Sequence, residues 1–351
     1  MTLLEYIDKY GNFSFKEKSF NEVDNIILSS ISYLDLSSFV PHNMLSKISL
    51  QDTSILYFKW LKDDKNKITA HKSALKVFKC ICKKKRYKNL MLYNYKYIKG
   101  EKEQFKALTI DIDDKTSYIS FEGTDDLISG WKEDFYLACF YPVESQKASI
   151  HYANKFILSK RKLIFGGHSK GGNLALTAAC FSSRFVKDNI IAVYSNDGPG
   201  FRKKEFESDE YKEILPKYHL IIPNYSFFGL LLRHTDDYEV VKSSIKGIYA
   251  HDFLSWQVDD DKFKKTSLSK TSIFFSKSMK KWVESYNDND RLLFVNSMFE
   301  VFDKLNIKSV EEILKHKTLI PKIIIDTKPS SKVRRMQKDF IKIALEYLAL
   351  K

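Results

Sequence analysis

The sequence predicts an α/β fold in which a mostly parallel sheet lies between layers of helices. Two observations lead to this prediction. Short runs of β-branched and aromatic residues alternate with helical patterns through the middle of the chain, as parallel strands joined by crossover helices require. A G-x-S-x-G pentapeptide, residues 167–171, stands where one of these strands meets the next helix. The 351-residue length exceeds one minimal core, so additions to the sheet domain are expected.

Helices are expected first, in an N-terminal extension over residues 1–90 that packs on the core. From Phe20 to Leu36 apolar residues recur at three- and four-residue spacing, and Asn21 is placed to cap that helix. Residues 52–82 also show a helical pattern. The basic run 83–86 that follows is interpreted as a solvated face or loop.

The α/β core is expected over residues 91–262, and a mainly helical region over residues 263–351. Period-two runs and turn residues predict strands at 91–97, 105–112, 118–121, 163–165, 190–194 and 219–222. Helices are predicted at 138–155, 173–185 and 203–215, and the clearest amphipathic stretches of the C-terminal region are 292–305 and 336–350.

Composition narrows the class of protein. Lys and Arg number 58 against 44 Asp and Glu, a net charge of +14 that by itself suggests a binder of nucleic acid or of an anionic membrane. The lysines are however spread through nearly every segment and interleaved with acids, whereas single-stranded nucleic-acid sites combine a basic groove with aromatic rings. No nucleic-acid partner is therefore expected. Transient contact with an anionic membrane surface stays open as a hypothesis, and a basic membrane-surface or nucleic-acid binder as an alternative function.

The cysteines and the N-terminus point to a cytoplasmic protein. Four cysteines are too few for a disulfide scaffold, and Cys80 and Cys82 lack a matching second pair of metal ligands, so no metal site is expected. The first residues lack both the basic start and the apolar run of a secretory signal, and no window approaches the ~20 apolar residues of a membrane span.

The pentapeptide is the stretch that carries chemistry. A strand-to-helix turn of this kind lifts the hydroxyl of Ser169 above the carboxyl end of the sheet, where it can act as a nucleophile. The strained turn leaves no room for side chains at Gly167 and Gly171. The backbone N–H of Lys170, at the start of the following helix, is predicted to donate one hydrogen bond to an oxyanion. His168 is a supporting residue.

A nucleophilic serine needs an imidazole base, which in the order serine, acid, histidine lies C-terminal to Ser169. His251 is the preferred candidate, because it follows a strand-like run in a loop that can present its ring. His234 is the second candidate. His219 is interpreted as a strand residue, and His316 lies in the helical tail, past the last sheet element.

The acid is expected between the nucleophile and the histidine. Asp197 ends the strand that follows the pentapeptide, and a Gly-Pro-Gly turn behind it would fix its direction. Asp236 and Asp237 are alternative acids. The second oxyanion donor is expected in the loop after an earlier strand, where Gly123 lets the backbone approach the site and Thr124 offers an amide and a hydroxyl.

These motifs resemble the class 3 lipase branch of the α/β-hydrolases, and most closely a bacterial group of uncharacterised proteins related to it. The resemblance covers about residues 90 to 260. It implies an α/β-hydrolase three-layer sandwich, a triad of Ser169, an acid and His251, and oxyanion donation by Thr124 and Lys170. The matching segments are Ser120-Phe-Glu-Gly-Thr-Asp-Asp with Trp131 and Asp134 as supporting residues, Gly166-Gly-His-Ser-Lys-Gly-Gly-Asn-Leu-Ala, Ser195-Asn-Asp-Gly-Pro-Gly-Phe and His251-Asp-Phe-Leu-Ser-Trp.

Three positions depart from the lipase pattern. Glu122 stands where lipases of this class usually carry Arg, and Lys170 replaces the usual apolar residue after the nucleophile. No Asp occupies the loop 223–227, where such lipases commonly place their acid, and this absence moves the acid to Asp197, a position that resembles the one in pancreatic-type lipases.

The predicted function is a serine hydrolase of carboxyl esters or acyl lipids that forms an acyl-enzyme and requires no cofactor. The apolar run 227–232 is interpreted either as an acyl pocket or lid or as an ordinary buried helix or strand. A hydrolase-fold protein that binds ligands without catalysis is the alternative from another class.

Overall fold

The computed structural model describes residues 1–62, 71–100, 104–124, 128–304, 306–307, 312 and 330–349. Within them, an eight-stranded sheet has its strands in chain order. The strands up to β4 pair antiparallel, and every neighbouring pair from β4 to β8 is parallel. The strands are β1 (Ile48–Ser49), β2 (Met91–Lys99), β3 (Gln104–Asp111), β4 (Thr116–Phe121), β5 (Lys162–His168), β6 (Ile190–Asn196), β7 (Tyr218–Pro223) and β8 (Tyr238–Val241).

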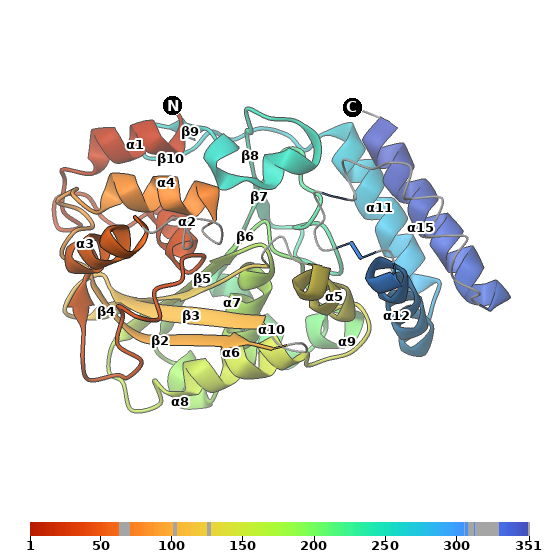
Figure 1. Ribbon diagram of the computed structural model, residues 1–351, viewed down its shortest axis with the longest axis horizontal. Coiled ribbons are helices and arrows are strands. Elements are labelled where there is room, and N and C mark those ends of the chain that lie inside the picture. The colour runs from red at the N-terminus through yellow and green to blue at the C-terminus, as the bar shows by residue number, and fades with distance from the viewer. Residues whose placement is uncertain are drawn as a thin grey trace.

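Helices cover both faces of the sheet, and the two layers have different origins (Figure 1). Parallel strands in chain order need right-handed crossovers, which place their helices on one face. The opposite face is covered by the N-terminal segment, whose helix α2 contacts β4 and β5. The predicted three-layer α/β-hydrolase sandwich is therefore confirmed. The crossover layer contains α6 (Glu144–Asn154), α7 (Lys170–Phe181), α8 (Arg184–Lys187), α9 (Lys203–Phe206) and α10 (Asp209–Ile214); the N-terminal segment contains α1 (Leu3–Tyr10), α2 (Glu22–Ile31), α3 (Leu50–Trp60) and α4 (Lys72–Ile81).

The predicted strands are found where expected, but three predicted helices differ. The helix expected at 138–155 begins only at Glu144 and is preceded by a separate helix, α5 (Ile128–Tyr136). Pro142 explains the break, since proline has no amide hydrogen and keeps the residue before it out of the helical region. The helix expected at 173–185 starts earlier, at Lys170, and the one expected at 203–215 is split into α9 and α10.

The N-terminal layer is fixed by a buried ion pair that the sequence pattern did not indicate. Asn21 caps α2 as predicted, and Asp24 completes the capping box. Arg86 reaches Asp24 with a 2.5 Å contact, and both side chains are fully buried. The basic run 83–86 lies in a loop, as one of the two interpretations expected, but Arg86 is not solvated and ties the end of the run to α2. Of the predicted helical span 52–82, residues 63–70 lie outside the described residues.

The described residues contain three apolar clusters. One lies between the N-terminal helices and the sheet, and a second lies between the sheet and the crossover helices. The third joins α5 to the C-terminal helices, where Phe135 packs against Phe299 and Phe340. The predicted division into domains at residues 90 and 262 remains a prediction. Strand β1, which precedes the first boundary, and strand β10 (Lys262–Phe263), at the second boundary, both pack into the first cluster. The C-terminal helices are α11 (Lys270–Glu284), α12 (Asp288–Lys304) and α15 (Ser331–Ala349).

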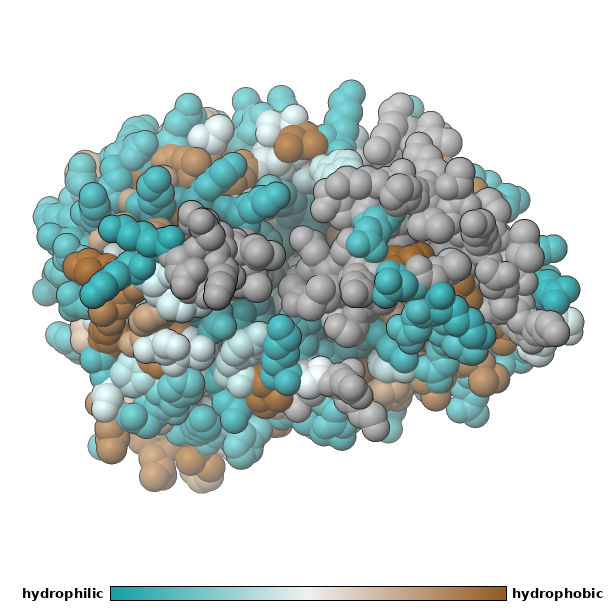
Figure 2. Space-filling model, in the orientation of Figure 1, coloured by the Kyte–Doolittle hydropathy of each residue, from teal (hydrophilic) through white to brown (hydrophobic). Residues whose placement is uncertain are grey.

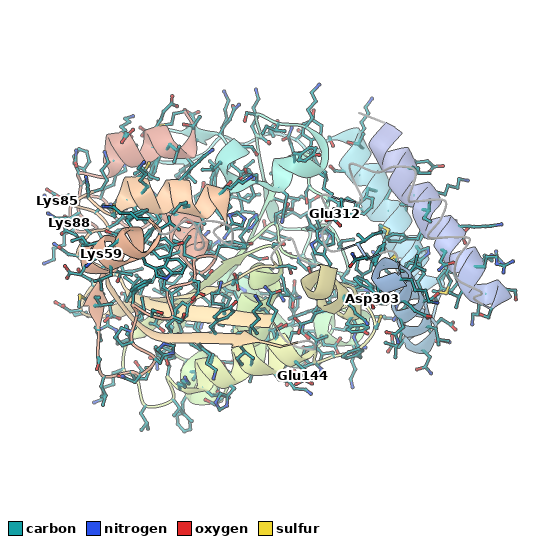
Figure 3. The ribbon with its side chains drawn as sticks, viewed as in Figure 1. Lys59, Lys85, Lys88, Glu144, Asp303 and Glu312 are labelled. Carbon is teal, nitrogen blue, oxygen red and sulfur yellow. The ribbon has the colours of Figure 1, made fainter. Side chains whose placement is uncertain are left out.

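Charged side chains surround the molecule. The labelled Lys59, Lys85 and Lys88 lie by the N-terminal helices α3 and α4, and the labelled Asp303 belongs to the C-terminal helix α12 (Figure 3). The face in view is predominantly hydrophilic (Figure 2). Among the described helices, none has the length and apolar character needed to cross a membrane.

Candidate active site

The G-x-S-x-G residues form a tight turn at the carboxyl end of β5. Ser169 joins β5 directly to α7 with a φ of 58°, a left-handed conformation that non-glycine residues adopt rarely. A Cβ at position 167 would lie 2.2 Å from the carbonyl of Gly171, and one at position 171 would lie 2.2 Å from the carbonyl oxygen of Phe121. The turn therefore requires glycine at both positions. Ser169 itself keeps 9% of its surface exposed.

The next strand along the sheet ends at Asp197, and this carboxylate meets His251. The Nδ1 atom of His251 lies 2.6 Å from Oδ2 of Asp197, which is fully buried. The other carboxylate oxygen accepts hydrogen bonds from Ser226 Oγ at 2.5 Å and from the Gly229 amide at 3.0 Å. With Nδ1 donating to Asp197, the neutral ring of His251 has an unprotonated Nε2, the form that a general base requires.

The structure thus brings together Asp197 and His251, and it places the rival acids elsewhere. Asp236 and Asp237 are exposed in the loop before β8. The amide of Ser169 donates to the carbonyl of Asn196 at 2.9 Å, so Ser169 and Asp197 lie on adjacent strand ends. We call Ser169, Asp197 and His251 the candidate triad.

The other candidate histidines have different partners. His219, in β7, stacks on Tyr194 with ring centroids 4.7 Å apart. His234 Nδ1 lies 2.9 Å from the carbonyl oxygen of the next residue. Burial lowers the pKa of both imidazoles. His316 lies outside the described residues.

His168 contacts His251, the candidate for the catalytic histidine, and helps to hold it in place. Its Nε2 lies 2.9 Å from the carbonyl oxygen of His251, and the two rings are 4.4 Å apart. The hydroxyl of Tyr33, which follows α2, lies 2.8 Å from His168 Nδ1. Burial holds the pKa of His168 well below its ordinary value, so the ring is neutral, donating through Nε2 and accepting from Tyr33 through Nδ1.

Tyr33 was missed by the sequence reasoning, because nothing in its local sequence marks it. Its contact with His168 spans 135 residues. Asn25 is a second such residue: its amide donates to Asn196 Oδ1 at 2.8 Å, and Asn196 in turn donates to the carbonyl of Gly167 at 3.0 Å. The N-terminal layer is therefore tied to the two residues that precede the nucleophile candidate.

The loop after β4 approaches the turn from the other side. A Cβ on Gly123 would lie 3.0 Å from Cβ of Ser169 and 2.5 Å from the carbonyl oxygen of His168, so this backbone packs directly against the turn. The hydroxyl of Thr124 donates to Oδ2 of Asp134 at 2.6 Å. Thr124 is thereby held at the edge of the site by α5.

The same helix holds Lys170. The ammonium of Lys170 lies 2.9 Å from Oε2 of Glu133 and 3.1 Å from the carbonyl oxygen of Gln104, and the Lys170 side chain is almost fully buried. Burial alone lowers the pKa of Lys170, but attraction from Glu133 and Asp134 outweighs it and raises this pKa above its ordinary value. The charged side chain thus serves the packing of α5, while the backbone N–H of Lys170 begins α7.

Glu122, the other departure from the lipase pattern, is also paired. Its Oε1 lies 2.6 Å from the ammonium of Lys106, with both side chains buried. The loop that carries Thr124 is therefore surrounded by three acids, of which Glu122 and Glu133 are buried in ion pairs and Asp134 is half-buried. Sequence reasoning identified Asp134 as a supporting residue and missed Glu133.

Aromatic rings line the site beside His251. Phe228 packs on the imidazole of His251 at 4.3 Å and on Trp131 at 5.5 Å. Phe227 stacks on Phe275 of α11 at 4.0 Å. The apolar run 227–232 is thus neither a helix nor a strand but a loop that links the site to the C-terminal helices.

No group of three or more His, Cys, Asp or Glu side chains in the described part of the chain is arranged to hold a metal ion. All four cysteines are free thiols. The arrangement instead offers a hydroxyl on a strained turn, a carboxylate-bound imidazole and backbone N–H groups, which together suit acyl transfer.

Comparison with known proteins gives a family match and similarities to solved structures. Among solved structures, M37 lipase shares 15% identity at a TM-score of 0.36, with 60% of this chain and 70% of that chain covered. A fungal lipase in an inhibitor complex shares 17% identity at a TM-score of 0.29, with 43% of this chain and just under two thirds, 66%, of that chain covered. Curated proteins give no match. The family model described as Mbeg1-like matches residues 81–300, the segment that contains the parallel sheet and the whole candidate triad, and the chain therefore belongs to the Mbeg1-like family.

Proposed function

We propose that the protein is a serine hydrolase of carboxyl esters or acyl lipids. The observation that carries the proposal is the hydrogen bond between His251 Nδ1 and Asp197 Oδ2 at the sheet edge where Ser169 occupies a positive-φ turn. Nucleophile, acid and base then follow in the order that α/β-hydrolases use, a pattern typical of acyl transfer. The resemblance to class 3 lipases supports the same reaction.

The reaction would proceed through an acyl-enzyme. Ser169 Oγ attacks the ester carbonyl while His251 Nε2 takes its proton, and the C–O bond of the tetrahedral adduct then breaks as His251 returns that proton to the leaving alcohol. Water, deprotonated by the same imidazole, hydrolyses the acyl-enzyme. Asp197 keeps the ring in its Nδ1–H tautomer and stabilises the imidazolium. No metal or organic cofactor enters these steps.

The oxyanion would be stabilised by Lys170 and Thr124. The backbone N–H of Lys170 follows the nucleophile at the N-terminus of α7, where negative charge is favoured. Thr124 adds its amide from the loop packed against Ser169, and its hydroxyl is oriented by Asp134. Donors held in place before the reaction contribute more than donors that must reorganise.

The substrate class is inferred from the rings beside the site. Trp131 and Phe228 give the side next to His251 an apolar character, which favours an apolar acyl group over a peptide. A cytoplasmic location and transient contact with anionic membrane surfaces belong to the same proposal.

A chain-length series of p-nitrophenyl esters tests the proposal. Wild type is expected to hydrolyse these esters, and Ser169→Ala is expected to lose at least a thousandfold in kcat. Ser182→Ala is the matched control. It changes the serine directly after α7, at the end opposite Ser169 and outside the candidate triad, and should retain wild-type rates. Equal rates for wild type and Ser169→Ala would refute the mechanism.

A further inference from the structure

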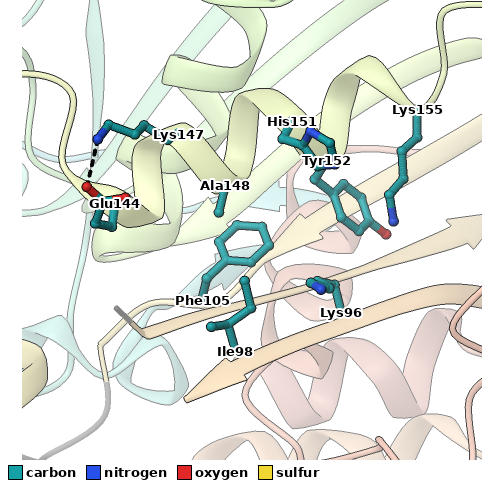
Figure 4. Close-up of a pocket in the computed structure, with 9 residues that line it drawn as sticks. All are labelled: Lys96, Ile98, Phe105, Glu144, Lys147, Ala148, His151, Tyr152 and Lys155. Atoms are coloured by element: carbon teal, nitrogen blue, oxygen red, sulfur yellow. Dashed lines mark hydrogen bonds and ion pairs between the residues drawn. The ribbon is translucent and has the colours of Figure 1, made fainter. Parts of the chain in front are cut away.

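A cavity lies outside the candidate triad, between α6 and the strands β2 and β3 (Figure 4). Its volume is about 300 Å³, the lower end of the range for small-molecule sites. Its wall includes Phe105, the residue after Gln104, whose carbonyl oxygen accepts from Lys170. The pocket shares no residue with the candidate triad.

The floor of the pocket is apolar. Phe105 and Tyr152 are buried with ring centroids 6.2 Å apart, and Ile98 and Ala148 complete the surface. The hydroxyl of Tyr152 donates to the carbonyl oxygen of Asn94 at 2.8 Å, so this side chain presents only its ring to the cavity. Such a floor suits a hydrocarbon body, and a 150 Å³ cavity accepts benzene, so roughly twelve carbon atoms fit.

The rim at one end of the pocket is positively charged. Lys155 donates to Asn94 Oδ1 at 3.0 Å and lies 5.4 Å above the Tyr152 ring. Lys96 is exposed beside it, and in the part of the chain that the structure describes no carboxylate forms an ion pair with either ammonium. Burial, together with repulsion from Lys96, lowers the pKa of Lys155. An anion placed between the two lysines would relieve that repulsion.

The opposite end of the pocket is already neutralised. Lys147 pairs with Glu144 at 2.7 Å in the first turn of α6 (Figure 4). His151 lies on the same face of the helix, between this pair and Lys155. The charge asymmetry gives a bound molecule one orientation, with its charged group toward Lys96 and Lys155.

We propose that this pocket binds a single-chain anionic amphiphile, with its head between Lys96 and Lys155 and its hydrocarbon body on the floor formed by Phe105 and Tyr152. Lysine recognises carboxylate and phosphate as a point charge, so the shared chemistry is an anionic group on a short alkyl chain. The proposal does not rest on the hydrolase reaction, because none of these residues belongs to the candidate triad.

Isothermal titration calorimetry with monomeric decanoate tests the proposal. Wild type should bind one decanoate, and the double variant Lys96→Gln, Lys155→Gln should bind at least tenfold more weakly. Ala148→Trp, which fills the pocket without changing its charge, should do the same. Lys212→Gln, an exposed lysine on α10, is the matched control and should bind as wild type does.

Two further ligands separate head from body. Decyl phosphate should bind the same site, and its affinity relative to decanoate assigns the preferred head group, whereas decanol should bind at least tenfold more weakly. Thermal melting checks the fold of each variant. If Ala148→Trp is unstable, the double variant Lys96→Gln, Lys155→Gln alone decides the outcome. Absence of decanoate binding, equal binding of decanol, or binding that both pocket variants retain would overturn the proposal.

Discussion

The two halves of the candidate active site are fixed by different chemistry. The triad half, Asp197 and His251, is held by hydrogen bonds from Ser226 and Gly229 and by the neutral ring of His168. The oxyanion half is held by buried charges of α5, chiefly the ion pair of Lys170. A hydrogen bond to a charged group contributes roughly 1.5–3 kcal/mol, whereas removing one partner of a buried ion pair costs about 3–5 kcal/mol.

Because of this difference, substitutions in the two halves should affect different measured properties. Changes in the triad half should act mainly on the chemical step, because the protein around it stays paired. Changes in the oxyanion half should act mainly on stability, because they leave a charge buried without its partner.

The largest expected effect comes from the triad half. Asp197→Asn should lower kcat about 10⁴-fold, because the amide favours the wrong tautomer of His251. Steady-state ester hydrolysis measures this loss. Asp236→Asn, an exposed acid of the loop before β8, is the matched control and should stay within twofold of wild type. A loss at Asp236 as large as that at Asp197 would move the acid to that loop.

The second effect falls on the oxyanion half. Glu133→Gln should lower the free energy of unfolding by about 3–5 kcal/mol, since it leaves the Lys170 ammonium buried without its counter-charge. Denaturant titration measures it. Glu144→Gln breaks an exposed ion pair on the adjacent helix and should cost less than about 1 kcal/mol.

A compensating variant sharpens this result. Lys170→Met with Glu133→Leu removes both charges and should restore most of the stability, while the backbone N–H at position 170 remains to serve the oxyanion. If the double variant were as unstable as Glu133→Gln, an uncompensated charge would not be the cause.

The third effect is a pH dependence that originates in the triad half. Burial depresses the pKa of His168 in the folded state, so protons bind the unfolded chain more readily. Stability should therefore be constant above the unfolded-state pKa of about 6.5 and fall below it, by up to about 1.4 kcal/mol per pH unit from this residue.

Burial also lowers the pKa of His219 and of His234, so both residues add to the slope of stability against pH. Denaturant titrations between pH 5 and 8 measure the total, and His168→Gln should reduce the slope by the share of one group. A slope that His168→Gln leaves unchanged would contradict a neutral buried His168.

The smallest effect is expected from the N-terminal layer. Tyr33→Phe removes the hydroxyl next to His168 Nδ1, and should lower kcat less than tenfold and stability by about 1 kcal/mol. Tyr286→Phe, which loses a hydrogen bond to Asp339 at a distance from the triad half, is the control and should change stability alone. An unchanged kcat in Tyr33→Phe would show that His168 does not depend on this hydrogen bond.

Most of the fold could be predicted because its signals are local. Strand alternation, the Asn21 cap and the glycines of the nucleophile turn act within a few residues of their own positions. These signals predicted N-terminal helices packed on the core, but not that they would cover the second face of the sheet. This placement depends on the strand order, which sets the face on which the crossovers lie and leaves the other face for the N-terminal segment.

The candidate site divides in the same way. Ser169 and the glycines around it follow from one motif, and chain order restricts the positions of the acid and the histidine. Tyr33 and Glu133 could not be inferred, because their partners are distant in sequence: 135 residues separate Tyr33 from His168, and 37 separate Glu133 from Lys170. Only the packing of α2 and α5 brings these pairs together.

The central claim is that Ser169 is a nucleophile activated by His251. Labelling of the folded protein with a fluorophosphonate, followed by peptide mapping, tests it most directly. We expect one label on Ser169 in wild type, no label at that position in Ser169→Ala, and much slower labelling in His251→Ala. A folded wild-type protein that is not labelled, or that is labelled only on another serine, would contradict the claim.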